Sequence, residues 1–200
     1  MPHIKECRAP DLSEFHSPVV SEYALRIVFH GAGTSDRRAR SFVINFILSV
    51  DKAIREYNAA RELLVQYAAS SNRTTLLIEG LGRFETCINS TKRALRSIDR
   101  LAAQQAGPEV ERLTRRLLQS HKALITCIRD SIEHMDAFVQ TGELKEGEPH
   151  ALAISPDSEF LEIASYRISL ASLAQLLRRL RGLASELTEF KEQPSENVDA

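Results

Sequence analysis

Residues 36–69 decide the fold, and they read DRRARSFVINFILSVDKAIREYNAARELLVQYAA. Apolar side chains recur here at steps of three and four residues, and Arg61 is the one interruption: Val43, Ile47, Val50, Ile54, Tyr57, Leu64 and Ala68. This period places them on one face of an α-helix, as a stripe that must be buried. We therefore predict a long helix over residues 36–69, preceded by a loop that ends in the helix-capping residues Ser35 and Asp36.

The same period predicts three further helices, over residues 73–104, 107–141 and 169–191. In the first of these, Gly80 and Gly82 each cost about 1 kcal/mol relative to alanine, so we expect its ordered start nearer Arg83. The second should start at residues 107–109, where a proline and an acid suit a first turn, and end at residues 141–142.

The remaining segments are shorter and less regular. Residues 1–18 hold three prolines and predict an irregular N-terminal arm, and residues 192–200 predict a disordered tail. Residues 19–30 fit a helix or a strand equally well, since periodicity alone does not decide between them. Two apolar segments, 151–154 and 160–166, flank a turn-like Ser-Pro-Asp-Ser stretch and predict a small β-hairpin.

Together these elements predict an all-α fold, an up-and-down bundle of four to five helices with a small β-hairpin before the last helix. Each amphipathic stripe needs neighbouring helices to cover it, and the bundle supplies them. We expect one helical domain over residues 19–191, between the arm and the tail.

The composition agrees with a helical protein, and the cysteine count, apolar runs and net charge exclude several classes of function. Ala, Glu, Lys, Leu and Arg make up 91 of the 200 residues, a share typical of long-helix proteins. The three cysteines, Cys7, Cys87 and Cys127, are far apart and odd in number, which favours a reduced cytoplasmic setting over a disulfide framework. No apolar run is long enough to span a membrane, so we expect no membrane partner. The net charge of −1 gives no global attraction for nucleic acid, although a local one remains open.

Several enzyme classes lack their motifs in this chain. No glutamate has a histidine three residues later, as a di-iron bundle requires, and His-Glu-x-x-His and Gly-x-Ser-x-Gly are absent. The glycine pattern of dinucleotide-binding proteins is also absent. We therefore expect neither a metal nor an organic cofactor.

One polar segment, residues 128–136 (IRDSIEHMD), stands out near the end of the predicted helix 107–141. Arg129 and His134 are five positions apart, about 140° around a helix, so the long arginine can reach toward the histidine. Asp130 is four residues before His134 and could hold its ring, while Glu133 is placed for an ion pair with Arg129. The spacing itself is common: Arg115 and Arg116 precede His121 in the same way, but a core leucine follows Arg116.

Arg129, Asp130, Glu133, His134 and Asp136 resemble the Arg-Asn/Asp-x-x-Glu-His-x-Asp signature of a bacterial branch of HEPN-domain proteins. The resemblance implies a four- to five-helix bundle that forms a homodimer and brings two motifs into one cleft. Many members are metal-independent endoribonucleases that act as toxins, phage-defence effectors or RNA-processing factors. Others are non-catalytic modules. The resemblance covers residues 36–190, and the insertion at 142–165 departs from the smallest members.

The implied chemistry is cleavage of RNA by its own ribose 2′-OH. Such cleavage needs a group that takes and returns a proton near pH 7 and a cation beside the phosphate oxygens. Histidine and arginine suit these tasks, so His134, Arg129 and Asp130 are the catalytic candidates, supported by Glu133 and Asp136.

Two alternatives stay open beside the nuclease. One is a non-catalytic helical module that binds RNA or another protein, and the other is an antitoxin-type regulatory bundle whose last helix binds a partner. The 20 arginines predict mainly solvated helix faces, with RNA-backbone contact as the lesser alternative for two clusters. These clusters are Arg93, Arg96 and Arg100, and Arg178, Arg179 and Arg181.

Overall fold

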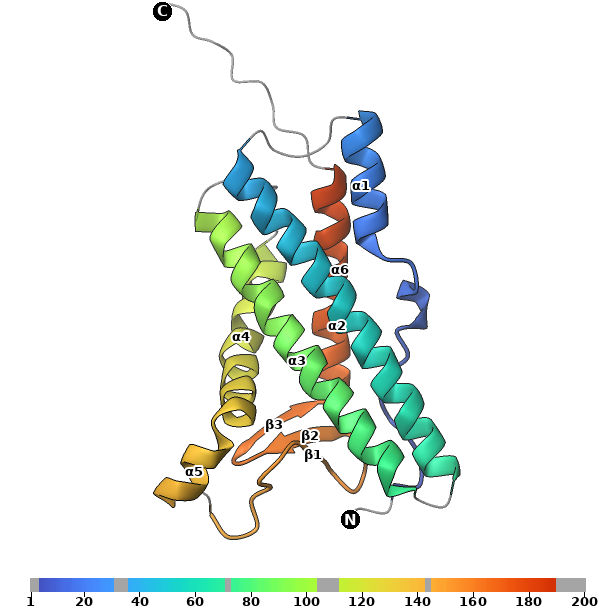
Figure 1. Cartoon of the computed structure of the whole chain (residues 1–200), viewed down its shortest axis with the longest axis vertical. Helices are drawn as coiled ribbons and strands as arrows, with labels where there is room; N and C mark the ends of the chain where they lie inside the picture. The colour runs from blue at the N-terminus through green and yellow to red at the C-terminus, as the bar shows by residue number, and fades with distance from the viewer. Residues whose placement is uncertain (1–3, 31–35, 71–72, 104–111, 143–144, 190–200) are drawn as a thin grey trace, which may run out of the picture.

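The computed structural model describes residues 4–30, 36–70, 73–103, 112–142 and 145–189, most of them helical (Figure 1). The helices are α1 (Val19–His30), α2 (Arg37–Ala69), α3 (Thr74–Ala103), α4 (Arg112–Glu133), α5 (Met135–Thr141) and α6 (Leu170–Glu189). A 3₁₀ turn, η1 (Ser13–Phe15), lies in the N-terminal arm, and strands β1 (Ala153–Ile154), β2 (Phe160–Ile163) and β3 (Tyr166–Ser169) precede α6. The predicted fold class, a helical bundle with a small β element before the last helix, is confirmed.

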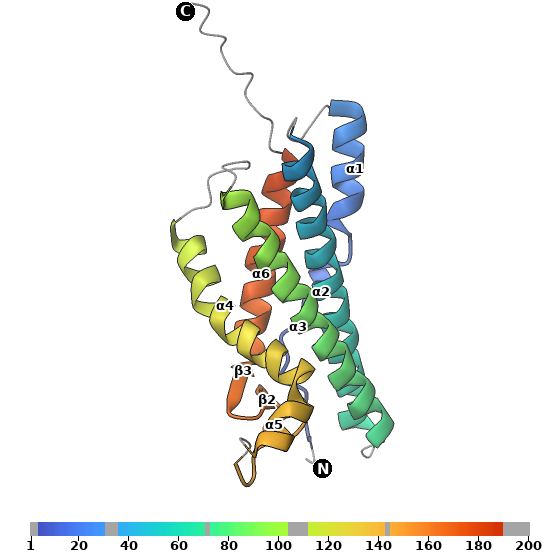
Figure 2. The ribbon, with the colours of Figure 1, turned by 60° about the vertical axis from the view of Figure 1, so that its left-hand side comes forward.

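The antiparallel helices α2 and α3 form the longest pair in the bundle (Figures 1 and 2). Their facing stripes are buried as the sequence predicts, and the rings of Tyr57 and Phe84 meet edge to face with their centroids 5.7 Å apart. Glu56 is also buried at this interface, where Arg83 of α3 donates to its carboxylate over 3.0 Å. This pair fixes one long wall against which α1, α4 and α6 pack.

Side-chain caps explain where several helices begin. The Asp36 carboxylate accepts a bond of 2.7 Å from the Arg38 amide at the start of α2, as predicted for a capping residue. Residues 19–30, left open by the sequence, form a helix because Asp51 of α2 accepts from the amides of both Val19 and Val20. A tertiary contact thus supplies the cap for α1, and no sequence pattern within residues 19–30 shows it.

Helix α3 begins at Thr74, so the expectation of a later start near Arg83 is wrong. Gly80 lies close to α2, with a Cβ position 3.5 Å from the Ala60 carbonyl oxygen. The packing of the two helices outweighs the low propensity of Gly80 and Gly82.

The helix predicted over 107–141 is also corrected, because it is two helices with a break at His134. The His134 amide still donates to the Asp130 carbonyl, and the His134 carbonyl accepts from the Ala137 amide. The predicted start at residues 107–109 lies outside the described residues, as do the loop at 31–35 and the tail at 192–200.

The β element has three strands rather than the two of the predicted hairpin, in the order β1-β2-β3 with antiparallel pairing. The third strand begins directly after a tight turn at Ala164, which has a φ of 48°. Leu161, Ile163 and Ile168 point into the core at the foot of the bundle. The sheet therefore closes that end of the core between α4 and α6 (Figure 1).

The N-terminal arm is irregular, as predicted, but it is part of the packed structure. Ile4, Ala9 and Leu12 are buried in the same core as the helices. Arg61, the interruption of the α2 stripe, donates to the Ala9 carbonyl and forms an ion pair with Asp11. Its place in the stripe is thus explained by the arm that covers it.

Two arginines of α6 also hold the arm, and of these Arg178 is exposed, as expected for a solvated face, while Arg181 is half-buried. Arg178 bonds to the Glu14 carboxylate and the Asp11 carbonyl. Arg181 bonds to the Ser17 carbonyl and lies 5.9 Å from the centroid of the Phe15 ring.

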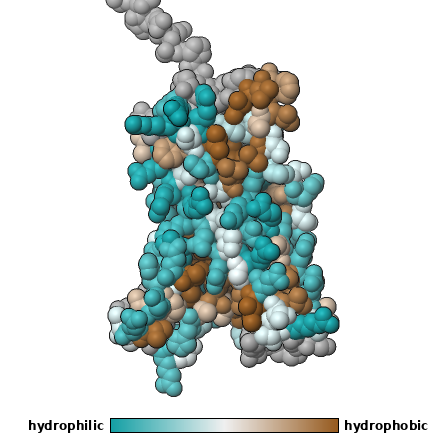
Figure 3. Space-filling view, in the orientation of Figure 1, coloured by the Kyte–Doolittle hydropathy of each residue, from teal (hydrophilic) through white to brown (hydrophobic). Residues whose placement is uncertain are grey.

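The surface over α1 is the most apolar part of the view in Figure 3. Leu25, Val28 and Phe29 are 59%, 74% and 71% exposed there. By contrast, the middle of this view, over α3 and α4, is mostly hydrophilic (Figure 3). None of the helices in the described ranges has the length and hydropathy needed to cross a membrane.

Candidate functional site

The candidate residues lie at the last turn of α4 and the bend that follows it. Arg129, Asp130 and Glu133 belong to α4, His134 occupies the bend, and Asp136 lies in the first turn of α5. The helical bond from the His134 amide to the Asp130 carbonyl is 2.9 Å long, so helical geometry persists up to this residue. His134 is exposed, so its imidazole is open to solvent.

Arg129 is held by its own helix. Its guanidinium forms an ion pair with the Asp130 carboxylate at 3.0 Å and a second, close pair with the Glu133 carboxylate. The ion pair with Glu133 is the one that the spacing predicts. Since two acids face one guanidinium, Arg129 does not offer a free cation to a ligand.

Asp130 does not hold the histidine as the spacing suggests. Its carboxylate instead accepts a bond of 2.6 Å from the ammonium group of Lys92, on α3, and a second bond from Arg129. No hydrogen bond between the Asp130 carboxylate and the His134 ring exists in the described structure. The bond from Lys92, and after it the bond from Arg129, lowers the pKa of Asp130 below its ordinary value.

Lys92 is the member of this cluster that sequence reasoning missed. Its side chain is only 16% exposed, and the Asp130 carboxylate satisfies its ammonium group. The signal was weak, because a lysine on another helix has no fixed spacing from residues 129–134. With Lys92 and Arg129 against Asp130 and Glu133, the four charges cancel.

A groove between α3 and α4 begins at Lys92 and runs away from the bend. It has a volume of about 440 Å³, and the residues that line it are mostly polar: Lys92, Leu95, Arg96, Asp99, Arg100, Ala103, Lys122 and Thr126. A second cross-helix ion pair, from Lys122 to Asp99 at 2.7 Å, bridges the groove farther along. Arg96 and Arg100 are exposed and form no ion pair with the described residues.

The groove connects to the candidate residues through one ridge of α4. Lys122, Thr126, Asp130 and His134 follow each other at intervals of four residues, which places them along a single ridge. This spacing is visible in the sequence and could have indicated a shared edge. The facing ridge of α3 carries Lys92, Arg96 and Arg100, and the sequence analysis assigned the two arginines to a solvated face.

The bend offers one exposed imidazole beside charges that are paired with one another. Within the described ranges, no group of three or more histidine, cysteine, aspartate or glutamate side chains is placed to hold a metal ion. The cysteines are free thiols, and burial raises the pKa of Cys87 to about 12. An exposed imidazole can take up and release protons, so proton transfer is the chemistry that the bend offers.

Comparison with known proteins finds no matching family model, no similar curated protein and no similar solved structure.

Proposed function

We propose that this protein is a metal-independent endoribonuclease of the HEPN type, acting at the bend after α4. The observation that carries the proposal is the exposed His134 imidazole at a helix break, next to the Arg129 cluster and in line with a basic groove. An accessible imidazole and nearby cations are the groups that cleavage through the 2′-OH needs.

The proposed reaction is an internal transesterification. His134 takes the proton of the ribose 2′-OH, and the 2′ oxygen bonds to the adjacent phosphorus. The bond from phosphorus to the 5′ oxygen breaks, and that oxygen leaves with a proton supplied by a second acid. The products are a 2′,3′-cyclic phosphate and a 5′-hydroxyl, with no net change in protons.

For this reaction, Arg129 has to exchange one of its carboxylate partners for the phosphate of the substrate. A phosphate oxygen would take the place of the Glu133 or Asp130 carboxylate, and the bidentate guanidinium would then face the developing negative charge. A homodimer would bring a second His134 to act as the acid. The biological settings that fit are those of toxins, phage defence and RNA processing.

A cleavage assay in the presence of EDTA tests the proposal. Single-stranded RNA is incubated with the wild-type chain and with His134→Ala, and the products are analysed for cyclic phosphate ends. His121→Ala is the matched control, because His121 also follows arginines on α4 but bonds to the Leu117 carbonyl. We expect His134→Ala to lose at least about 100-fold in rate and the control less than about twofold. Equal cleavage by His134→Ala and wild type contradicts the proposal.

A non-catalytic interaction module is the second candidate, and the apolar residues on α1 favour it. Leu25, Val28 and Phe29 form an exposed patch of the kind that marks protein contacts. If this patch binds another chain, Phe29→Ser abolishes the association measured by light scattering, and wild-type protein with EDTA leaves RNA intact. An antitoxin-type bundle is disfavoured at α6, because two of its arginines already hold the N-terminal arm.

A further inference from the structure

The groove between α3 and α4 is lined by charged residues that have no role in the proposed reaction at the bend. Two cross-helix ion pairs bridge it, Lys92 with Asp130 and Lys122 with Asp99. Between these pairs lies Arg96, which lines the groove with no acidic partner in the described structure, opposite Thr126. Arg100, one turn farther along α3, is likewise exposed and without such a partner.

Ion pairs inside the groove hold its walls together, and they leave a surplus of positive charge. Each bridging lysine is matched by one aspartate, so Arg96 and Arg100 supply the net charge of the groove. An exposed guanidinium that no acid holds is free to bind phosphate oxygens through paired N–H groups. The groove lies where α3 and α4 pack against each other, and residues of both helices line it.

We propose that this groove binds the sugar-phosphate backbone of single-stranded RNA and leads the strand to His134. The choice of RNA as the ligand rests on the proposed function. The groove, about 440 Å³ in volume, is a furrow between two helices that the phosphates of one strand can follow. From the Lys122 level to His134 the α4 ridge rises about 18 Å, the length of about five stacked nucleotides.

The lining of the groove also predicts how the strand is recognised. No aromatic side chain is among the described residues that line it, so bases have no stacking platform there. Binding through Arg96 and Arg100 then depends on phosphates alone. It is independent of base sequence and falls steeply with salt.

The test measures binding separately from cleavage. A fluorescently labelled 2′-O-methyl oligonucleotide of twelve residues has no 2′-OH to attack, and its anisotropy is followed with the full chain between 50 and 200 mM salt. The test variant is Arg96→Gln with Arg100→Gln. Its matched control is Arg37→Gln with Arg179→Gln, which removes the same charge from exposed arginines of α2 and α6.

We expect the groove variant to bind at least tenfold more weakly at 50 mM salt. The slope of log K against log salt should fall by about 1.4, the value for two lost phosphate contacts on a single strand. The control should keep the wild-type affinity and slope. Equal binding by the two double variants overturns the proposal, and a duplex that binds as tightly as the single strand does so too.

The outcomes separate this inference from the proposed function. If the groove variant loses binding but wild type does not cleave unmodified RNA, RNA binding in the groove is supported and the proposed nuclease activity is refuted. If wild type cleaves RNA and the groove variant binds and cleaves like wild type, the nuclease activity is supported and RNA binding in the groove is refuted. Gln has nearly the helix propensity of arginine and the sites are exposed, so both double variants should melt within a few degrees of wild type.

Discussion

At the scale of single residues, the contacts around the bend come partly from α4 itself and partly from the neighbouring helix α3. Spacing along one helix places Arg129 with Glu133, and the structure contains that ion pair. Spacing also places Asp130 with His134, but a lysine from the neighbouring helix takes the carboxylate. Local patterns describe contacts within an element, whereas the contact with Lys92 depends on how α3 and α4 pack.

The Asp130 carboxylate gives a prediction about pH. Lys92 and Arg129 lower its pKa in the folded chain, so the stabilisation is fully present above the ordinary aspartate value of 3.8. It is lost as the pH falls through the lower folded pKa. We expect Asp130→Asn to reduce the free energy of unfolding at pH 7 by no more than about 1 kcal/mol, because the carboxylate is 43% exposed and solvent screens it.

Urea titrations of wild type and Asp130→Asn, monitored by circular dichroism from pH 7 to pH 3, measure this effect. The difference between the two proteins should be constant down to about pH 4 and then shrink. Glu62→Gln, at an exposed site on α2 with no ion pair in the described structure, is the control for losing a carboxylate. A difference that grows toward low pH would refute the assignment of Lys92 as the partner.

Cys87 gives a prediction about reactivity. Its thiol is fully buried between α2 and α3, and that burial raises its pKa to about 12. We expect no alkylation of Cys87 by iodoacetamide at pH 8 in the folded protein and complete alkylation in 6 M guanidinium. Peptide mass spectrometry separates it from Cys7 and Cys127, which are only partly buried. Rapid labelling of Cys87 in the folded state would show that the α2–α3 interface opens readily.

At the scale of elements, periodicity predicts the long helices because each buries one continuous stripe. The α2 helix spans Arg37–Ala69 against a predicted 36–69, and α6 spans Leu170–Glu189 against 169–191. The errors occur where a distant contact decides the outcome. Packing against α2 extends α3 through Gly80 and Gly82, and Asp51 caps α1. No proline or glycine lies near His134, so the sequence does not predict the break there.

The two glycines of α3 therefore make a prediction about the helix itself. A Cβ at Gly82 meets nothing within 4 Å, so Gly82→Ala should raise the free energy of unfolding by about 0.5–1 kcal/mol. At Gly80 the new methyl group would make ordinary contacts of 3.5 Å with α2, so Gly80→Ala should gain a similar or smaller amount. Gly142→Ala should lose stability, because Gly142 has a φ of 71°. Chemical denaturation ranks the three variants, and a destabilised Gly82→Ala would mean that α3 is not helical there.

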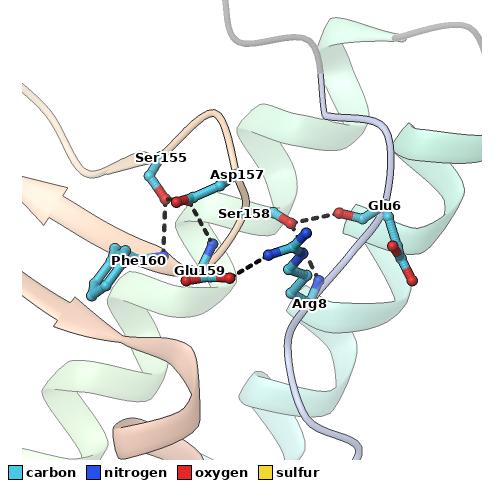
Figure 4. A network of polar contacts seen from close by, with 7 residues as sticks. All are labelled: Glu6, Arg8, Ser155, Asp157, Ser158, Glu159 and Phe160. Carbon is cyan, nitrogen blue, oxygen red and sulfur yellow. Dashed lines mark hydrogen bonds and ion pairs between the residues drawn. The ribbon is translucent and has the colours of Figure 1, made fainter.

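At the scale of the whole molecule, the N-terminal arm connects the small sheet with the helices. Ser158, in the turn between β1 and β2, is fully buried and has a φ of 55°. Its hydroxyl donates to the Glu6 carbonyl and accepts from the Arg8 amide, while Arg8 forms an ion pair with Glu159 (Figure 4). The arm thus lies between α2, α6 and the sheet, and it holds the β turn to the helices.

This placement predicts that the arm unfolds together with the bundle. Leu12 is fully buried among the helices, so Leu12→Ala should lower the free energy of unfolding by about 2–5 kcal/mol, the range for a buried leucine. The control is Leu48→Ala, at a site on α2 that is 46% exposed, which should cost far less. Urea denaturation followed by both circular dichroism and tyrosine fluorescence should show one shared midpoint that moves to lower urea in Leu12→Ala. Two separate transitions, or an unchanged midpoint, would mean that the helices are stable without the arm and that the buried arm residues contribute nothing to the core.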